Sequence, residues 1–186
     1  ILLVFMQLSS KIINQFKPII FLLLTLPSFY WFTKYLLGNF GVNPIDKLMD
    51  ELGKFSLQLI IITLLISALS KLNFFRSLQA IRRMIGLFAF YYVCLHFLSY
   101  IILDHFFNFN FIIKDIAKRP FITFGFISFV LLLPMAFTST NNMMKKLTFK
   151  IWKRIHYLIY IIAPLSSLHF LLLKKADKTE PIIYFV

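Results

Sequence analysis

Long apolar runs, separated by short clusters of charged residues, constrain the fold of this chain more than any other feature. The complete runs lie at about 18–37, 54–70, 84–103, 121–137 and 155–173, and a further run begins at 181. Each complete run has roughly the 20 residues that an α-helix needs to cross the hydrocarbon core of a bilayer. Because 60% of the 186 residues are hydrophobic, this surface cannot be hidden in one water-soluble core.

We therefore predict an all-α membrane protein with a single domain over residues 1–186. The expected architecture is a six-helix transmembrane bundle whose sixth helix is truncated in this chain, because the last run stops after Val186. The first residue is Ile1 rather than Met, so we expect both chain ends to be cut.

The formal net charge of +13 does not by itself indicate a nucleic-acid partner. Lys and Arg residues lie in short clusters between apolar runs rather than along one soluble face, so a membrane lipid surface is the expected anionic partner. With the N-terminus in the cytoplasm, eleven of the 20 basic residues and none of the seven acids fall on the inner side. The positive-inside rule therefore favours a cytoplasmic N-terminus. The single cysteine, Cys94, excludes an internal disulfide or a cysteine-based zinc site.

Three histidines, His96, His156 and His169, lie inside strongly apolar segments. Such a histidine usually marks a ligand, a proton path or a cofactor, because an unsatisfied imidazole in lipid is costly. His96 follows Arg83 by 13 residues and His169 follows Arg154 by 15, which places both rings roughly 20 Å from the inner boundary. Two histidines at one depth on separate helices can bind a haem iron from both sides, as in a six-coordinate b-type centre for electron transfer.

The third histidine, His156, lies near the inner surface together with the paired arginines Arg82 and Arg83. A second, inner haem would need a histidine where Arg82 stands, and a guanidinium cannot coordinate iron because it has no lone pair to give. It can instead bind an anionic group such as an FMN phosphate, a haem propionate or a reduced quinone oxygen. His156 can exchange the proton that such redox chemistry requires. We therefore expect an electron-entry site, for flavin or quinone, at Arg82, Arg83 and His156.

The same residues also have simpler interpretations. His96 and His169 suit a packed core in which their rings bond backbone carbonyls, and His156 suits an interfacial histidine beside Trp152. The arginine pair suits a cytoplasmic anchor. His105, at the outer end of its apolar run, is expected to be a solvated loop residue.

Several segments together closely resemble the MsrQ family of ferric-reductase-like transmembrane proteins. These segments are GVNPID, RRMIGL, CLHFLSY, KRPFITFGFISFVLLLPMAFTST and WKRIHYLIYIIAPLSSLHF. In this comparison His96, His156 and His169 match the family's three histidines, and Arg82 and Arg83 match its paired arginines. One departure is Leu52, where relatives commonly carry threonine before the glycine.

The resemblance implies a haem b-binding subunit of the bacterial inner membrane. Such a subunit passes electrons from the quinone pool or a cytosolic flavin reductase to MsrP, a periplasmic molybdopterin enzyme that repairs methionine sulfoxide in envelope proteins. The family is also described as binding FMN. The resemblance therefore implies an electron-transfer subunit of an oxidoreductase system rather than its catalytic subunit.

Two other classes remain open at this stage. A membrane ferric reductase or oxidase-like haem protein would carry the same histidines but needs a flavin and nicotinamide domain or a second histidine pair. A haem-free membrane scaffold would bind no coloured group. No Gly-rich phosphate loop, GxSxG motif or carboxylate metal cluster is present in the sequence, so we expect no hydrolase or group-transfer chemistry.

Overall fold

The computed structural model describes residues 2–174 and Tyr184, and all its regular elements are helical. Five helical segments are long and apolar enough to cross a membrane: Ile12–Leu36, Pro44–Leu69, Asn73–Asp104, Pro120–Thr138 and Phe149–Leu173. The five complete spans predicted from the sequence are therefore confirmed. The predicted sixth helix, from residue 181, lies outside the described residues apart from Tyr184.

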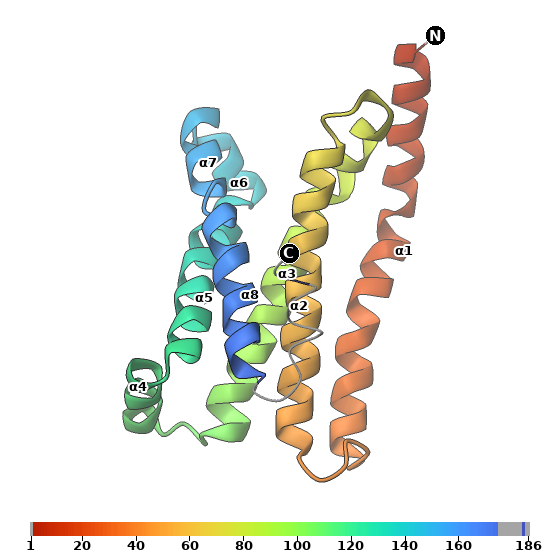
Figure 1. The fold of residues 1–186 in the computed structure, drawn as a ribbon. Helices are drawn as coiled ribbons and strands as arrows, with labels where there is room; N and C mark the ends of the chain where they lie inside the picture. Colours follow the sequence, from red (N-terminus) through yellow and green to blue (C-terminus); the bar gives the residue numbers. More distant parts are fainter. Residues whose placement is uncertain (1, 175–183, 185–186) are drawn as a thin grey trace. The chain divides into compact units, whose positions relative to one another are not determined.

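Contacts divide the chain into two compact units, Ile1–Ser99 and Tyr100–Val186. The first unit contains α1 (Leu2–Leu36), α2 (Pro44–Leu69), the short 3₁₀ helix η1 (Asn73–Leu78) and α3 (Gln79–Ser99). Figure 1 shows α2 running alongside α3, and these two helices form the most extensive pairing in the unit. The expectation of a single domain over 1–186 stays a prediction.

Tyr92 on α3 is one of the largest fully buried side chains among the described residues. Its hydroxyl donates a hydrogen bond to the Leu24 carbonyl at 2.6 Å and accepts one from the Ser28 amide at 3.2 Å. These two groups flank Pro27, which has no amide to offer to the helix. A neighbouring helix thus satisfies the backbone of α1 where the proline interrupts it, as transmembrane prolines require.

The second unit begins with a short π-helix, η2 (Tyr100–Asp104), which continues the third membrane span. Its remaining helices are α4 (Phe109–Lys118), α5 (Pro120–Thr138), α6 (Asn141–Lys146), α7 (Phe149–His156) and α8 (Ile159–Leu173). The principal pairing joins α5 to α8, which lie side by side in Figure 1, and α4 packs against α5.

Two local features of the second unit differ from the sequence-based expectation. The fifth span was predicted as one helix over 155–173, but it divides at Tyr157 and Leu158 into α7 and α8. In addition, α4 is an amphipathic helix that buries Ile112 and Asp115, and no helix was predicted there from the sequence.

Candidate functional site

His96 is held on α3 by a backbone group of the neighbouring helix α2. Its Nδ1 lies 2.8 Å from the carbonyl oxygen of Met49. A carbonyl only accepts hydrogen bonds, so Nδ1 carries the proton and donates it. The lone pair of the neutral ring is then on Nε2, which is the nitrogen able to coordinate a metal.

Gly53 makes this approach of the His96 ring possible. It follows Met49 by four residues and therefore lies one turn further along the same face of α2. A Cβ placed on Gly53 would lie 3.1 Å from Nδ1 and 3.2 Å from Cε1 of His96, closer than most real Cβ contacts. The imidazole thus packs directly against the glycine backbone, where a larger residue would push it away.

His169 is held in the same manner in the second unit. Its Nδ1 lies 2.6 Å from the carbonyl oxygen of Phe121 on α5, so this nitrogen also donates and Nε2 has the lone pair. Gly125 follows Phe121 by four residues, and a Cβ there would lie 2.9 Å from Nδ1 and 3.0 Å from Cε1 of His169. The Phe121 ring also stacks beside the imidazole, with centroids 6.3 Å apart.

We call each arrangement a histidine cradle: a ring whose Nδ1 donates to a helix carbonyl and whose Nδ1 and Cε1 atoms lie close to a glycine four residues after that carbonyl. The first cradle is Met49, Gly53 and His96, and the second is Phe121, Gly125 and His169. A carbonyl bonded to Nδ1 fixes the ring orientation and makes Nε2 a better electron donor to a metal. In each cradle Nε2 is therefore the ring nitrogen able to coordinate a metal.

His156, at the end of α7, has a different environment. Its Nδ1 lies 3.0 Å from the Trp152 carbonyl, its Nε2 lies 3.2 Å from the Ser139 hydroxyl, and its ring stacks on the Trp152 indole at 3.9 Å. The Ser139 hydroxyl also lies 2.7 Å from the Met135 carbonyl. Because a hydroxyl has one proton, Ser139 donates to Met135 when His156 is doubly protonated and is able to donate to Nε2 when His156 is neutral. This setting accommodates both protonation states of His156.

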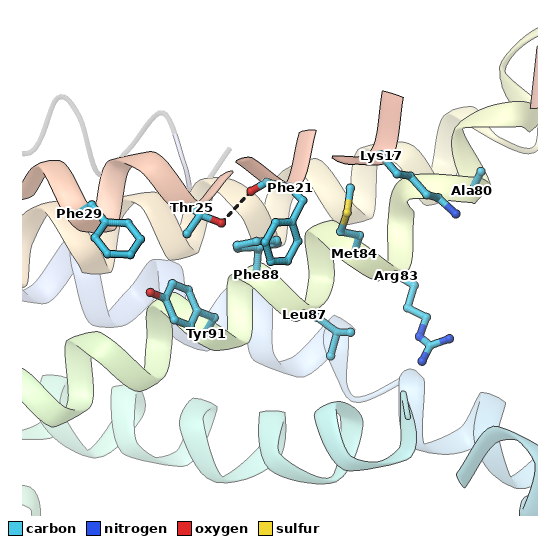
Figure 2. A pocket seen from close by; sticks show the side chains of 10 residues that line it. All are labelled: Lys17, Phe21, Thr25, Phe29, Ala80, Arg83, Met84, Leu87, Phe88 and Tyr91. Carbon is cyan, nitrogen blue, oxygen red and sulfur yellow. Dashed lines mark hydrogen bonds between the residues drawn. The ribbon is translucent and has the colours of Figure 1, made fainter. Parts of the chain in front are cut away.

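The paired arginines differ in their surroundings. Arg83 lines a groove of about 500 Å³ between α1 and α3, together with Lys17, as Figure 2 shows. Arg82 is not among the residues that line the groove. Both arginines belong to the first unit and His156 to the second, so a joint site of the three residues stays a prediction.

His105 lies in the loop after η2, as expected from the sequence, but its ring is shielded from solvent rather than solvated. Its side chain is 14% exposed and lies against the rings of Tyr100 and Phe111. Its Nε2 lies 3.5 Å from an Asp104 carboxylate oxygen and 3.7 Å from one of Asp115. Asp115 also accepts a hydrogen bond from Tyr100, and Arg119 pairs with it at 2.8 Å, so the acid is satisfied without His105.

Comparison with known proteins places the chain among membrane redox proteins. Residues 52–166 match the family described as ferric reductase like transmembrane component. The chain is 48% identical to the protein-methionine-sulfoxide reductase heme-binding subunit MsrQ of Caulobacter vibrioides, over 79% of this chain and 70% of that protein. The MsrQ of Herminiimonas arsenicoxydans is 46% identical, over 80% and 69% of the two chains.

The chain belongs to the MsrQ family. The family resemblance found in the sequence is thereby confirmed, as is the all-α membrane fold class. The chain is also 38% identical to the magnetosome protein MamZ of Magnetospirillum gryphiswaldense, over 91% of this chain but 27% of that protein. No solved structure matches the chain.

For this member of the MsrQ family, the sequence pointed to the histidines but not to the backbone carbonyls and glycines that orient their rings. Among the described residues, no cluster of three or more His, Cys, Asp or Glu side chains is placed to hold a metal ion. The cradles consist of one imidazole and backbone atoms, which leave little trace in a sequence. The available signal was a glycine inside a helix, at Gly53 in α2 and at Gly125 in α5, because a glycine there leaves room for the close approach of another group.

Proposed function

We propose that the chain binds haem b through axial bonds from Nε2 of His96 and Nε2 of His169. The two cradles support this proposal most directly, because in each the Nδ1 of the imidazole donates to a carbonyl and Nε2 is the nitrogen able to coordinate a metal. The MsrQ relatives are named as heme-binding subunits, which supports the same cofactor. A haem with two imidazole ligands supplies reversible one-electron transfer rather than oxygen binding.

The protein's own residues would give this centre three properties. The Met49 and Phe121 carbonyls orient the imidazoles and raise the basicity of Nε2. Gly53 and Gly125 leave room for the rings against their helices. The helices that carry the two histidines are apolar and have the length of membrane spans, so the bilayer around them would keep the bulk of the water away.

We further propose that the chain is the electron-transfer subunit of a protein-methionine-sulfoxide reductase in the bacterial inner membrane, with a cytoplasmic N-terminus. Electrons would pass to a periplasmic molybdopterin reductase of the MsrP type. The relatives' names support a reductase made of more than one subunit. Inner-membrane location, orientation and the MsrP partner rest on the charge distribution and on the family resemblance.

Electron entry is proposed at the inner face, from the quinone pool or a cytosolic flavin reductase, near Arg82, Arg83 and His156. The hydrogen bond between Nε2 of His156 and the Ser139 hydroxyl, which can donate or accept, supports a proton-exchanging role there. FMN binding rests on the family resemblance alone.

Replacing Arg82 or His156 by alanine should keep most of the haem and slow its reduction by quinol or reduced flavin, with dithionite reduction unchanged. Unchanged rates of haem reduction by both quinol and reduced flavin in these variants would show that Arg82 and His156 are not part of the entry site.

The absorption spectrum of the purified protein tests the proposal against its alternatives. A b-type Soret band and α-band on dithionite reduction are expected, whereas a haem-free scaffold would be colourless. The reduced protein mixed with methionine sulfoxide alone should stay reduced, and it should reoxidise once an MsrP-type partner is added. Rapid reoxidation by the sulfoxide without a partner would make this chain the catalytic subunit, and rapid reduction of ferric iron instead would favour a ferric reductase.

A further inference from the structure

The groove between α1 and α3 has two chemically different ends. Figure 2 shows Lys17 and Arg83 at one end and Phe29 at the other, with the rings of Phe21, Phe88 and Tyr91 between them. Its volume is about 500 Å³. All these residues belong to the first unit, so the groove is defined within that unit alone.

The length of the groove corresponds to one leaflet of a bilayer. Lys17 and Phe29 are 12 residues apart on α1, which is about 18 Å at 1.5 Å per residue. Half of the hydrocarbon core is about 15 Å thick. Lys17 lies near the start of the membrane span Ile12–Leu36. The cationic end therefore falls at an interface and the aromatic end near the bilayer midplane.

The middle of the groove is lined mainly by aromatic rings, and the protons of its two hydroxyl groups are donated to other protein groups. The Thr25 hydroxyl donates to the Phe21 carbonyl at 2.7 Å, and the Tyr91 hydroxyl donates to the Ser28 hydroxyl at 3.1 Å. Phe21 and Phe88 pack edge to face at 5.1 Å and close the wall between the helices. Phe21 is still 55% exposed. This wall suits an acyl chain.

The charged end favours an anionic head group. Two of the described residues that line the groove are cationic and none is acidic. Arg and Lys bind ionised phosphate oxygens more strongly than neutral carbonyl oxygens, because the hydrogen bonds are then charge-assisted at both partners. A quinone head is neutral and gains less from this pair of cations.

We propose that this groove is a binding site for an anionic phospholipid. The phosphate lies between Lys17 and Arg83, and one acyl chain runs along Phe21, Phe88 and Tyr91 toward Phe29. The inference does not rest on haem binding. It gives Arg83 a contact with the lipid phosphate in addition to its proposed place at the electron-entry site.

Native mass spectrometry of the full chain tests the site with phosphatidylglycerol and phosphatidylcholine of identical acyl chains. The unmodified protein should retain phosphatidylglycerol in preference to phosphatidylcholine. The double variant Lys17→Gln/Arg83→Gln should lose this preference, with a fall in phosphatidylglycerol retention of about tenfold or more. The matched control, Lys71→Gln/Arg76→Gln, removes the same charge from residues that do not line the groove and should keep the preference.

A second variant separates the site from general effects of charge on folding. Thr25→Trp fills the middle of the groove and leaves both cations in place, and it should also lose retained phosphatidylglycerol. Equal retention of the two lipids by the unmodified protein, or unchanged retention in the variants, would overturn the proposal. The proposal would also be overturned, in favour of a quinone site, by a different result: a quinone co-purifies with the unmodified protein, and Lys17→Gln/Arg83→Gln loses this quinone but retains phospholipid as before.

Discussion

The two histidine cradles are built alike but differ in tightness. In the first, a Cβ on Gly53 would lie 3.1 Å from Nδ1 of His96, and the hydrogen bond to Met49 is 2.8 Å long. In the second, the corresponding distances at Gly125 and Phe121 are 2.9 Å and 2.6 Å. A methyl group on Gly53 would therefore require the His96 ring to give way by a few tenths of an ångström, whereas one on Gly125 would force a shift of the His169 ring.

The comparison shows that each proposed ligand histidine is oriented by a neighbouring helix of its own unit. His96 depends on α2 and His169 on α5, and neither cradle uses a residue of the other unit. The geometry of a ligand can therefore be disturbed in one unit while the other stays intact. Substitutions at the two glycines test this independence.

The largest effect is expected from Gly125→Ala. The added methyl group would lie 2.9 Å from Nδ1 of His169, so the ring must leave the Phe121 carbonyl. Loss of such a hydrogen-bonding partner typically lowers metal affinity about 10–100-fold. Haem content per protein and the midpoint potential measure the change. A normal potential with full haem content would show that the cradle does not control the ligand.

Gly53→Ala should also weaken haem binding, but by less than Gly125→Ala does. At 3.1 Å the His96 ring can shift slightly and keep its bond to Met49, so we expect haem affinity to fall by less than about tenfold. The matched control is Gly86→Ala on α3, where the nearest atom is a Thr63 methyl carbon at an ordinary 3.6 Å. Gly86→Ala should leave the potential unchanged. A larger effect at Gly53 than at Gly125 would reverse the comparison.

The membrane spans were predictable because 20-residue apolar runs have few alternatives in a bilayer. The cradles were not, because their acceptors are the backbone carbonyls of Met49 and Phe121, and any residue type has a carbonyl. Which carbonyl faces His96 is decided by the register of α2 against α3, which the apolar pattern does not determine. His105 was misjudged for a related reason, since its partners Tyr100 and Asp115 are brought to it by η2 and α4.

Tyr92→Phe should affect stability in the first unit and leave ligation alone. It removes the hydroxyl that satisfies the Leu24 carbonyl and the Ser28 amide beside Pro27. Leaving buried backbone groups without a partner costs about 1–3 kcal/mol. Denaturant unfolding should report this loss, and the haem spectrum should be unchanged in the folded protein. A shifted haem spectrum with no loss of stability would show that Tyr92 acts on the His96 cradle instead.

The smallest effect is expected from His105→Gln. Asp115 keeps Tyr100 and Arg119 as partners, so the substitution should change the free energy of unfolding by less than about 1 kcal/mol. Haem absorption should match that of the unmodified protein. Loss of haem in this variant would mean that the cofactor is bound near α4 rather than by the cradles.

Electron paramagnetic resonance of the oxidised protein at low temperature tests the central claim most directly. We predict a low-spin signal from two imidazole ligands, which His96→Ala and His169→Ala each convert to a high-spin signal. Added imidazole should restore the low-spin signal in both variants, which would show that a ligand was lost and not the fold. An unchanged low-spin signal in either variant, without added imidazole, would contradict axial ligation by that histidine.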